Sequence, residues 1–128
     1  MRISLDTNVL VKLFAGDQAA VEKLTPHEQY VVSATVLGEF KAGLDSATRQ
    51  GAKALAVLNE FIGSDSVEVV AVDETTSNFY AKIRRALMSL GKPIPTNDIW
   101  IAASAMQHGT PLVTFDSHFA VIPMLDLV

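Results

Sequence analysis

The chain has 128 residues and no cysteine, and ten Lys and Arg against fourteen Asp and Glu give a formal net charge of −4. This length fits one domain with a core of its own, and the lack of cysteine excludes disulfides, thiolate zinc sites and cysteine nucleophiles. No apolar run is long enough for a signal peptide or a membrane span, so we expect a cytoplasmic protein without membrane contact.

The first half of the chain alternates short apolar segments with helical patterns. We expect a strand over 2–5 that ends at Asp6, followed by a helix that Thr7 or Asn8 caps and that continues to Phe14. Further along, the pattern predicts a helix from 17 to about 24, a strand over 29–32, a helix from Ser33 to about Ala47 and a helix from Thr48 to Ile62.

The second half continues the same alternation. The pattern predicts a strand over 67–72, a helix from Asp73 to Leu90 closed by Gly91, a helix from Thr96 or Asn97 to His108, a strand over 111–114 and a short strand over 121–125. Strands that alternate with helices of this length indicate a single α/β domain with a central, mainly parallel sheet flanked by helices. Such sheets bind ligands at the carboxyl ends of their strands.

Two acidic residues follow predicted strands. Asp6 ends the first strand, and a helix-capping role is the alternative for it, although Thr7 and Asn8 can cap instead. Asp116 follows the strand over 111–114, and its alternative role is to form a turn before Ser117. Because both acids lie at or just after strand ends, we expect them to face one crevice.

Two further acidic residues lie on predicted helices. Glu39 shares the edge of an apolar helix face, and the alternative is a surface glutamate paired with Lys12 or Lys41. Asp98 stands in a first helical turn, where the helix dipole favours an acid in any case. However, the residues three and four positions after Asp98 are apolar, so it points toward the inner face of its helix.

Together the four acids predict an all-oxygen site. The three histidines are far apart in the sequence and show no ligand spacing, so we expect surface or capping roles for them, although His118 closely follows Asp116. Carboxylate ligands suit Mg²⁺ or Mn²⁺ rather than zinc. Divalent ions held by carboxylates are a common means of hydrolysing phosphodiesters.

Four segments also resemble the motifs of PIN domains, in family order and over nearly the whole chain. They are Leu5-Asp6-Thr7-Asn8-Val9-Leu10, Ser33-Ala34-Thr35-Val36-Leu37-Gly38-Glu39-Phe40, Asn97-Asp98-Ile99-Trp100-Ile101-Ala102-Ala103 and Leu112-Val113-Thr114-Phe115-Asp116-Ser117-His118-Phe119. Their spacing is similar to the VapC branch, the toxin nucleases of toxin–antitoxin pairs. The resemblance implies a Mg²⁺- or Mn²⁺-dependent endoribonuclease that cuts RNA and is the toxin of such a pair. It implies a cognate antitoxin and a second copy of the chain as partners.

The predicted site has three parts. Asp6, Glu39, Asp98 and Asp116 are the expected metal-binding and catalytic residues, with Glu39 either binding the metal or orienting its water. The residues expected to position them are Thr7, Asn8, Asn97 and Thr114. The candidate RNA contacts are Lys12, Lys41, Lys82, Arg84, Arg85 and Lys92.

Two other functions stay open. A PIN-like module could bind RNA or protein without cutting it, although the chain retains all four acids. A phosphatase of the haloacid-dehalogenase type is the third option, but it needs an aspartate where Asn8 stands. We also predict a homodimer, whose contact uses some of the apolar residues near the amino end: Val9, Leu10, Leu13, Phe14, Val21 and Leu24.

Overall fold

The computed structural model describes residues 2–128 and has a four-stranded sheet in the order β3-β2-β1-β4, in which all neighbouring strands are parallel. This confirms the predicted α/β class. The elements are β1 Arg2–Leu5, α1 Thr7–Phe14, α2 Gln18–Leu24, β2 Gln29–Ser33, α3 Ala34–Ala42, α4 Arg49–Ile62, β3 Val67–Val70, α5 Glu74–Leu90, α6 Thr96–Gln107, β4 Leu112–Val113 and the 3-10 helix η1 Ser117–Val121.

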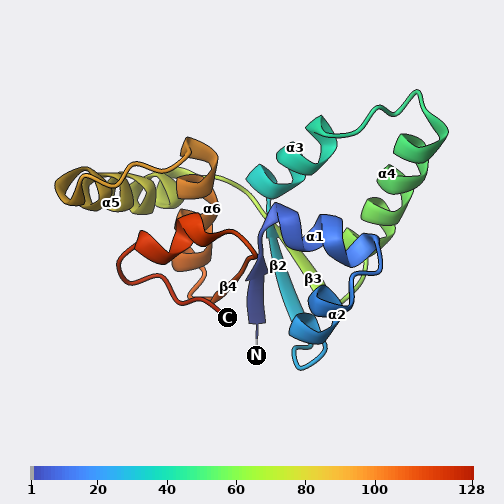
Figure 1. Ribbon diagram of the computed structural model, residues 1–128, viewed down its shortest axis with the longest axis horizontal. Coiled ribbons are helices and arrows are strands. Elements are labelled where there is room, and N and C mark those ends of the chain that lie inside the picture. The colour runs from blue at the N-terminus through green and yellow to red at the C-terminus, as the bar shows by residue number, and fades with distance from the viewer. Residues whose placement is uncertain (1) are drawn as a thin grey trace.

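The sheet separates two groups of helices. Figure 1 shows α1, α2 and α4 on one side of the sheet and α5 and α6 on the other, with α3 beyond the carboxyl end of β2. Strand β1 pairs with β4 in a register that places Leu5 beside Val113. The backbone N–H of Asp6 then donates to the Val113 carbonyl at 3.0 Å. Because of this register, the chain segments that follow β1 and β4 leave the sheet side by side.

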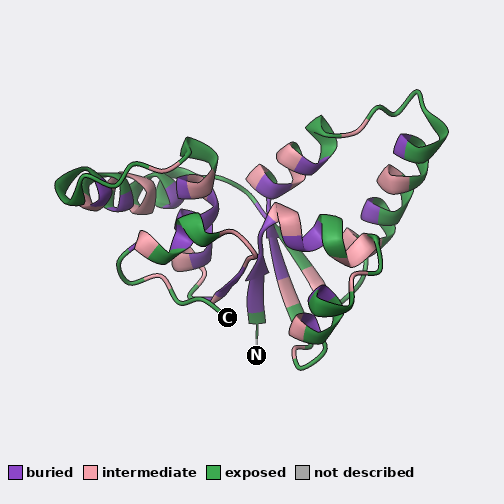
Figure 2. Ribbon diagram, in the orientation of Figure 1, coloured by how far each residue is buried: buried purple, intermediate pink, exposed green. Residues whose placement is uncertain are grey.

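The core fixes the position of α6. Residues 101–105 of this helix are all buried, and Figure 2 shows α6 with the buried colour over much of its length. Each large apolar side chain that is fully buried stabilises the fold by about 1.5–3 kcal/mol. The first turn of α6 is therefore held firmly, and Asp98 lies in that turn.

Two predicted elements are wrong. Helix α3 ends at Ala42 instead of Ala47, because Asp45 starts a turn in which its carboxylate accepts from the Ala47 N–H at 3.0 Å. The strand expected over 121–125 is absent, because the chain forms η1 and only Leu127 makes a bridge, to Leu112. Both errors concern short turns that compete with regular hydrogen bonding.

Three of the six apolar residues from which we predicted a dimer contact are buried within this one chain. Val9 and Leu10 are 0% exposed and Leu24 is 4% exposed, so they belong to the core of this one chain. Val21 is 37% exposed and is the one clearly exposed member of that predicted set. Within residues 2–128, no helix is both long and apolar enough to cross a bilayer.

Candidate active site

The structure brings the four predicted carboxylates together in one cleft of about 480 Å³. They come from four places in the fold: the end of β1, the middle of α3, the first turn of α6 and the segment between β4 and η1. The residues that line this acid cleft are Asp6, Thr7, Asn8, Val11, Lys12, Glu39, Asp98 and Asp116.

Asp6 is buried and held by two hydrogen bonds. Its Oδ1 accepts from the Thr7 N–H at 2.7 Å, and its Oδ2 accepts from the Thr114 hydroxyl at 2.7 Å. Asp6 is thus the N-cap of α1, and the expectation that Thr7 or Asn8 caps this helix is wrong. Burial raises the pKa of Asp6, these hydrogen bonds oppose the rise, and the neighbouring charges of Asp98 and Glu39 add to it.

Glu39 is half-buried and positioned from two sides. The Thr7 hydroxyl donates to its Oε1 at 2.6 Å, and the Asn97 side-chain amide donates to its Oε2 at 3.3 Å. The alternative pairing with Lys12 or Lys41 is not seen among the ion pairs of residues 2–128. Both carboxylate oxygens of Glu39 are therefore oriented by neutral donors, which leaves its negative charge uncompensated.

Asp98 and Asp116 meet at a histidine. His118 Nδ1 lies 3.1 Å from Asp98 Oδ2 and 3.2 Å from Asp116 Oδ1. One side-chain ligand atom from each of these three residues lies within 4.8 Å of the other two. Burial raises the pKa of Asp98, His118 lowers it, and Asp116 and Glu39 raise it again.

His118 joins the cluster, whereas we expected surface or capping roles for the histidines and noted only that His118 closely follows Asp116. The available signal was its place two residues after Asp116, because a tight turn returns its N–H to Asp116 Oδ1 at 2.9 Å. Its contact with Asp98 joins residues 20 positions apart, and that contact depends on the packing of η1 against α6.

The other polar residues support the loop that carries Asp116. Thr114 accepts at its Oγ1 from the Asp116 N–H at 2.9 Å while it donates to Asp6. Asn8 Oδ1 accepts from the Phe115 N–H at 3.3 Å. The predicted supporting residues thus all lie against the acids or against this loop, although their effect on a bound ion stays a prediction.

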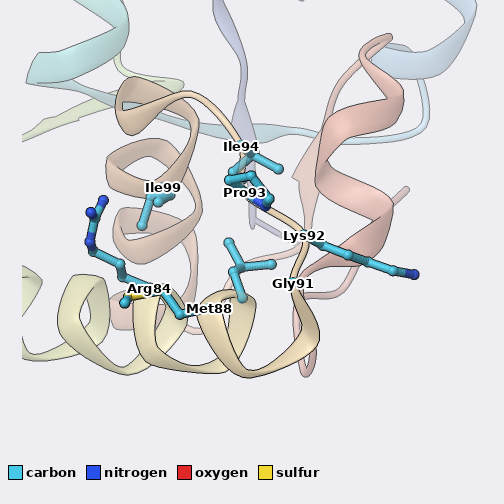
Figure 3. Close-up of a pocket in the computed structure, with 8 residues that line it drawn as sticks. Arg84, Met88, Gly91, Lys92, Pro93, Ile94 and Ile99 are labelled. Atoms are coloured by element: carbon cyan, nitrogen blue, oxygen red, sulfur yellow. The ribbon is translucent and has the colours of Figure 1, made fainter.

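Most of the predicted RNA contacts lie elsewhere. Of the six cations, only Lys12 lines the acid cleft. Arg84 and Lys92 line a separate, largely apolar pocket of about 310 Å³, and Figure 3 shows their side chains on opposite sides of it. The remaining candidates, Lys41, Lys82 and Arg85, are exposed on α3 and α5.

The donor set fits a hard divalent cation. Within residues 2–128, the ion pair that involves a Lys or Arg is Arg2 with Glu68, and the contacts of Asp98 and Asp116 are with the His118 ring, so no Lys or Arg pairs with the four acids. Asp6 is 5% exposed, and the Asp98 side chain is 13% exposed. Grouped, poorly hydrated carboxylates are costly without a counter-ion, and oxygen ligands of this kind suit Mg²⁺ or Mn²⁺.

Thr114 offers a direct test of how Asp6 is held. Thr114→Val keeps the shape of the side chain but removes the hydroxyl that bonds to Asp6. We expect a loss of about 10- to 100-fold in Mn²⁺ affinity, because ligands without their hydrogen-bonding partners lose orientation. Thr114→Ser retains the hydroxyl and should stay close to the parent protein. Calorimetric Mn²⁺ titration of both variants checks this, and equal affinities would contradict it.

The comparisons with known proteins agree with this geometry. Residues 3–124 match the PIN domain family. Two similar relatives are Ribonuclease VapC4 and Ribonuclease VapC5 of Mycobacterium tuberculosis. VapC4 is 30% identical over 78% of this chain and 76% of its own length. VapC5 is 30% identical over 92% of this chain and 85% of its own length. The solved structure of VapBC2 from Rickettsia felis, bound to a DNA fragment from their promoter, has a TM-score of 0.82 at 26% identity and covers 100% of this chain and 98% of that chain. With a match over nearly its whole length, the chain belongs to the PIN domain family.

Proposed function

We propose that this protein is a metal-dependent endoribonuclease and the toxin of a toxin–antitoxin pair. The observation that carries the proposal is the acid cleft, in which four carboxylates converge without a Lys or Arg partner among residues 2–128. Support comes from relatives that are named ribonucleases and from the likeness to a VapBC structure. A ribonuclease of this kind would act in the cytoplasm.

Each acid has a proposed role. Asp6, Asp98 and Asp116 hold Mg²⁺ or Mn²⁺, and Glu39 either joins them or orients the attacking water. When bound, such an ion activates water and stabilises the charge that develops on the phosphate oxygens. Thr7 and Asn97 hold the two oxygens of Glu39, and Thr114 holds Asp6, so two of the four acidic side chains are fixed by these hydrogen bonds before substrate arrives.

The alternative functions are disfavoured by particular residues. A phosphatase of the haloacid-dehalogenase type would need a carboxylate at position 8, whereas Asn8 accepts from the Phe115 backbone and serves the loop. A non-catalytic module gives no reason to group acids such as Asp6, which is buried, and Asp98, which is partly buried, whose pKa values are raised by burial and by neighbouring acids.

One experiment separates the three functions. The purified protein is given Mn²⁺ and offered single-stranded RNA and, separately, a generic phosphomonoester. We expect internal cleavage of the RNA and no release of phosphate from the monoester. Phosphate release would indicate a phosphatase, and RNA binding without cleavage would indicate a non-catalytic module.

The proposed partners are an antitoxin and a second copy of the chain. An apolar groove of about 580 Å³ between α1, α3 and α4 shares Thr7, Val11 and Glu39 with the acid cleft. We propose that an antitoxin segment covers this groove and blocks the cleft. The homodimer stays a prediction. Val9, Leu10 and Leu24 are buried within one chain, so they cannot contact a second copy. A measurement of the molecular mass in solution tests it.

A further inference from the structure

Two lysines and one phenylalanine form a cationic group at the edge of the acid cleft. Lys12 Nζ lies 5.3 Å and Lys23 Nζ 5.6 Å from the centroid of the Phe115 ring. Lys12 is on α1, Lys23 is on α2, and Phe115 is in the segment between β4 and η1. Ammonium groups at these distances are attracted by the ring electrons, so Phe115 gathers two positive charges from separate helices.

This cluster is tied directly to the candidate active site. Lys12 lines the acid cleft itself. Phe115 stands between Thr114, which bonds to Asp6, and Asp116, and its backbone N–H donates to Asn8. The hydrogen bonds that place the acids therefore also place the ring, and the ring places the two ammonium groups.

Neither lysine is paired with an acidic side chain. No Asp or Glu forms an ion pair with Lys12 or Lys23 in the part of the chain that the structure describes. Lys23 donates to the main-chain oxygen of Val128 at 2.8 Å, a contact that uses one of the three N–H donors of the ammonium group. Lys12 is exposed, and Lys23 is half-buried.

Electrostatics assign a ligand to this cluster. The chain has a net charge of −4, and the acid cleft repels a polyanion unless positive charge lies nearby. Lys12 is the one Lys or Arg among the residues that line this cleft. We propose that Lys12 and Lys23, gathered by Phe115, bind a phosphate group of the RNA strand that is not the group being cut. This inference rests on the proposed ribonuclease function.

The test compares the charge-removing variants Lys12→Gln and Lys23→Gln with Lys53→Gln. Lys53 is an exposed lysine on α4 that does not line the acid cleft, so its variant is a matched control for charge. Binding of labelled single-stranded RNA is measured in chelator, where cleavage is prevented, over a series of salt concentrations. Thermal melts establish that each variant is folded.

We expect each of the two cluster variants to lower the slope of log affinity against log salt by about 0.7, and to weaken binding roughly fivefold at about 0.1 M salt. With Mn²⁺ present, KM should rise by a similar factor at unchanged kcat, because a phosphate away from the reacting bond contributes equal binding before and during reaction. Phe115→Leu should weaken binding by about two- to fivefold, because the lysines lose the ring that gathers them.

Several results would overturn the inference. The first is that Lys12→Gln and Lys23→Gln show the same salt slope and RNA affinity as Lys53→Gln, and the second is that their loss of activity is confined to kcat. The third is that the parent protein does not bind RNA. The fourth is that the cluster variants bind an acidic protein partner more weakly while their RNA binding is intact. The proposed function fails separately, if the parent protein binds RNA with the expected slope but does not cut it in Mn²⁺.

Discussion

Asp98→Asn is expected to lower the rate of RNA cleavage by about 100-fold or more, because the loss of a ligand weakens both the bound ion and its alignment. The same change should leave the metal-free protein as stable as before, or more stable by about 1 kcal/mol, as is common when strain in an active site is relieved. The reason is that burial and the charges of Asp116 and Glu39 disfavour the ionised form of Asp98 and raise its pKa. Thermal melts in chelator and cleavage assays in Mn²⁺ measure the two effects.

The structural alternative for Asp98 predicts the opposite signs. If Asp98 mainly stabilises the start of α6, its loss should cost about 0.3–1 kcal/mol while activity falls only mildly. Asp65→Asn is the matched control, because Asp65 is exposed in the turn after α4 and lies outside the acid cleft. A destabilised but active Asp98→Asn protein would refute the assignment of this residue.

Mn²⁺ is expected to stabilise the protein at neutral pH and to have little effect near pH 4. In chelator, Asp6 and Asp98 have pKa values raised above the ordinary aspartate value of 3.8, so the folded state holds their protons more tightly than the unfolded state does. The contribution of these two groups to the free energy of unfolding therefore falls as pH rises from about 3.8 through their raised pKa values. Above this pH range both carboxylates are ionised. Their charge then destabilises the folded protein without metal, but it also attracts a cation.

The size of the metal effect follows from mass action. At a Mn²⁺ concentration about 100 times its Kd, the free energy of unfolding should rise by about 2.7 kcal/mol. The measurement is a set of melting curves across pH, with Mn²⁺ and with chelator, for the parent protein and for Asp98→Asn. The variant should show a smaller shift. Identical melting curves with and without Mn²⁺ at neutral pH would contradict the metal site.

The sequence predicts the place of some of the four acids in the cleft better than that of others. Asp6 and Asp116 follow strands, and the carboxyl ends of parallel strands share one edge of a sheet, so their proximity follows from the α/β pattern. Asp98 could be predicted because the helix after it is almost entirely apolar and has to enter the core. The sequence around Glu39 alone favours a surface glutamate, and the assignment of this residue rests mainly on the family resemblance.

The errors arise where contacts distant in sequence decide a local choice. Asp6, Thr7 and Asn8 are all good capping residues, but pairing of the Asp6 N–H with Val113 keeps Asp6 extended and makes it the cap. Pro95 is likewise the N-cap of α6, because its carbonyl accepts from the Asp98 N–H at 3.1 Å, so the expected cap at Thr96 or Asn97 is wrong. His118 reaches Asp98 only through the packing of η1 on α6. None of these pairings leaves a periodic signal in the sequence.

RNA cleavage in chelator, followed by addition of excess Mn²⁺ to the same sample, tests the central claim most directly. If the four carboxylates act by holding a divalent ion, cleavage should vanish in chelator, because the ion is what would activate the attacking water and stabilise the charge on the phosphate oxygens. Cleavage should return when Mn²⁺ or Mg²⁺ exceeds the chelator. Undiminished cleavage in excess chelator would contradict the metal-dependent mechanism.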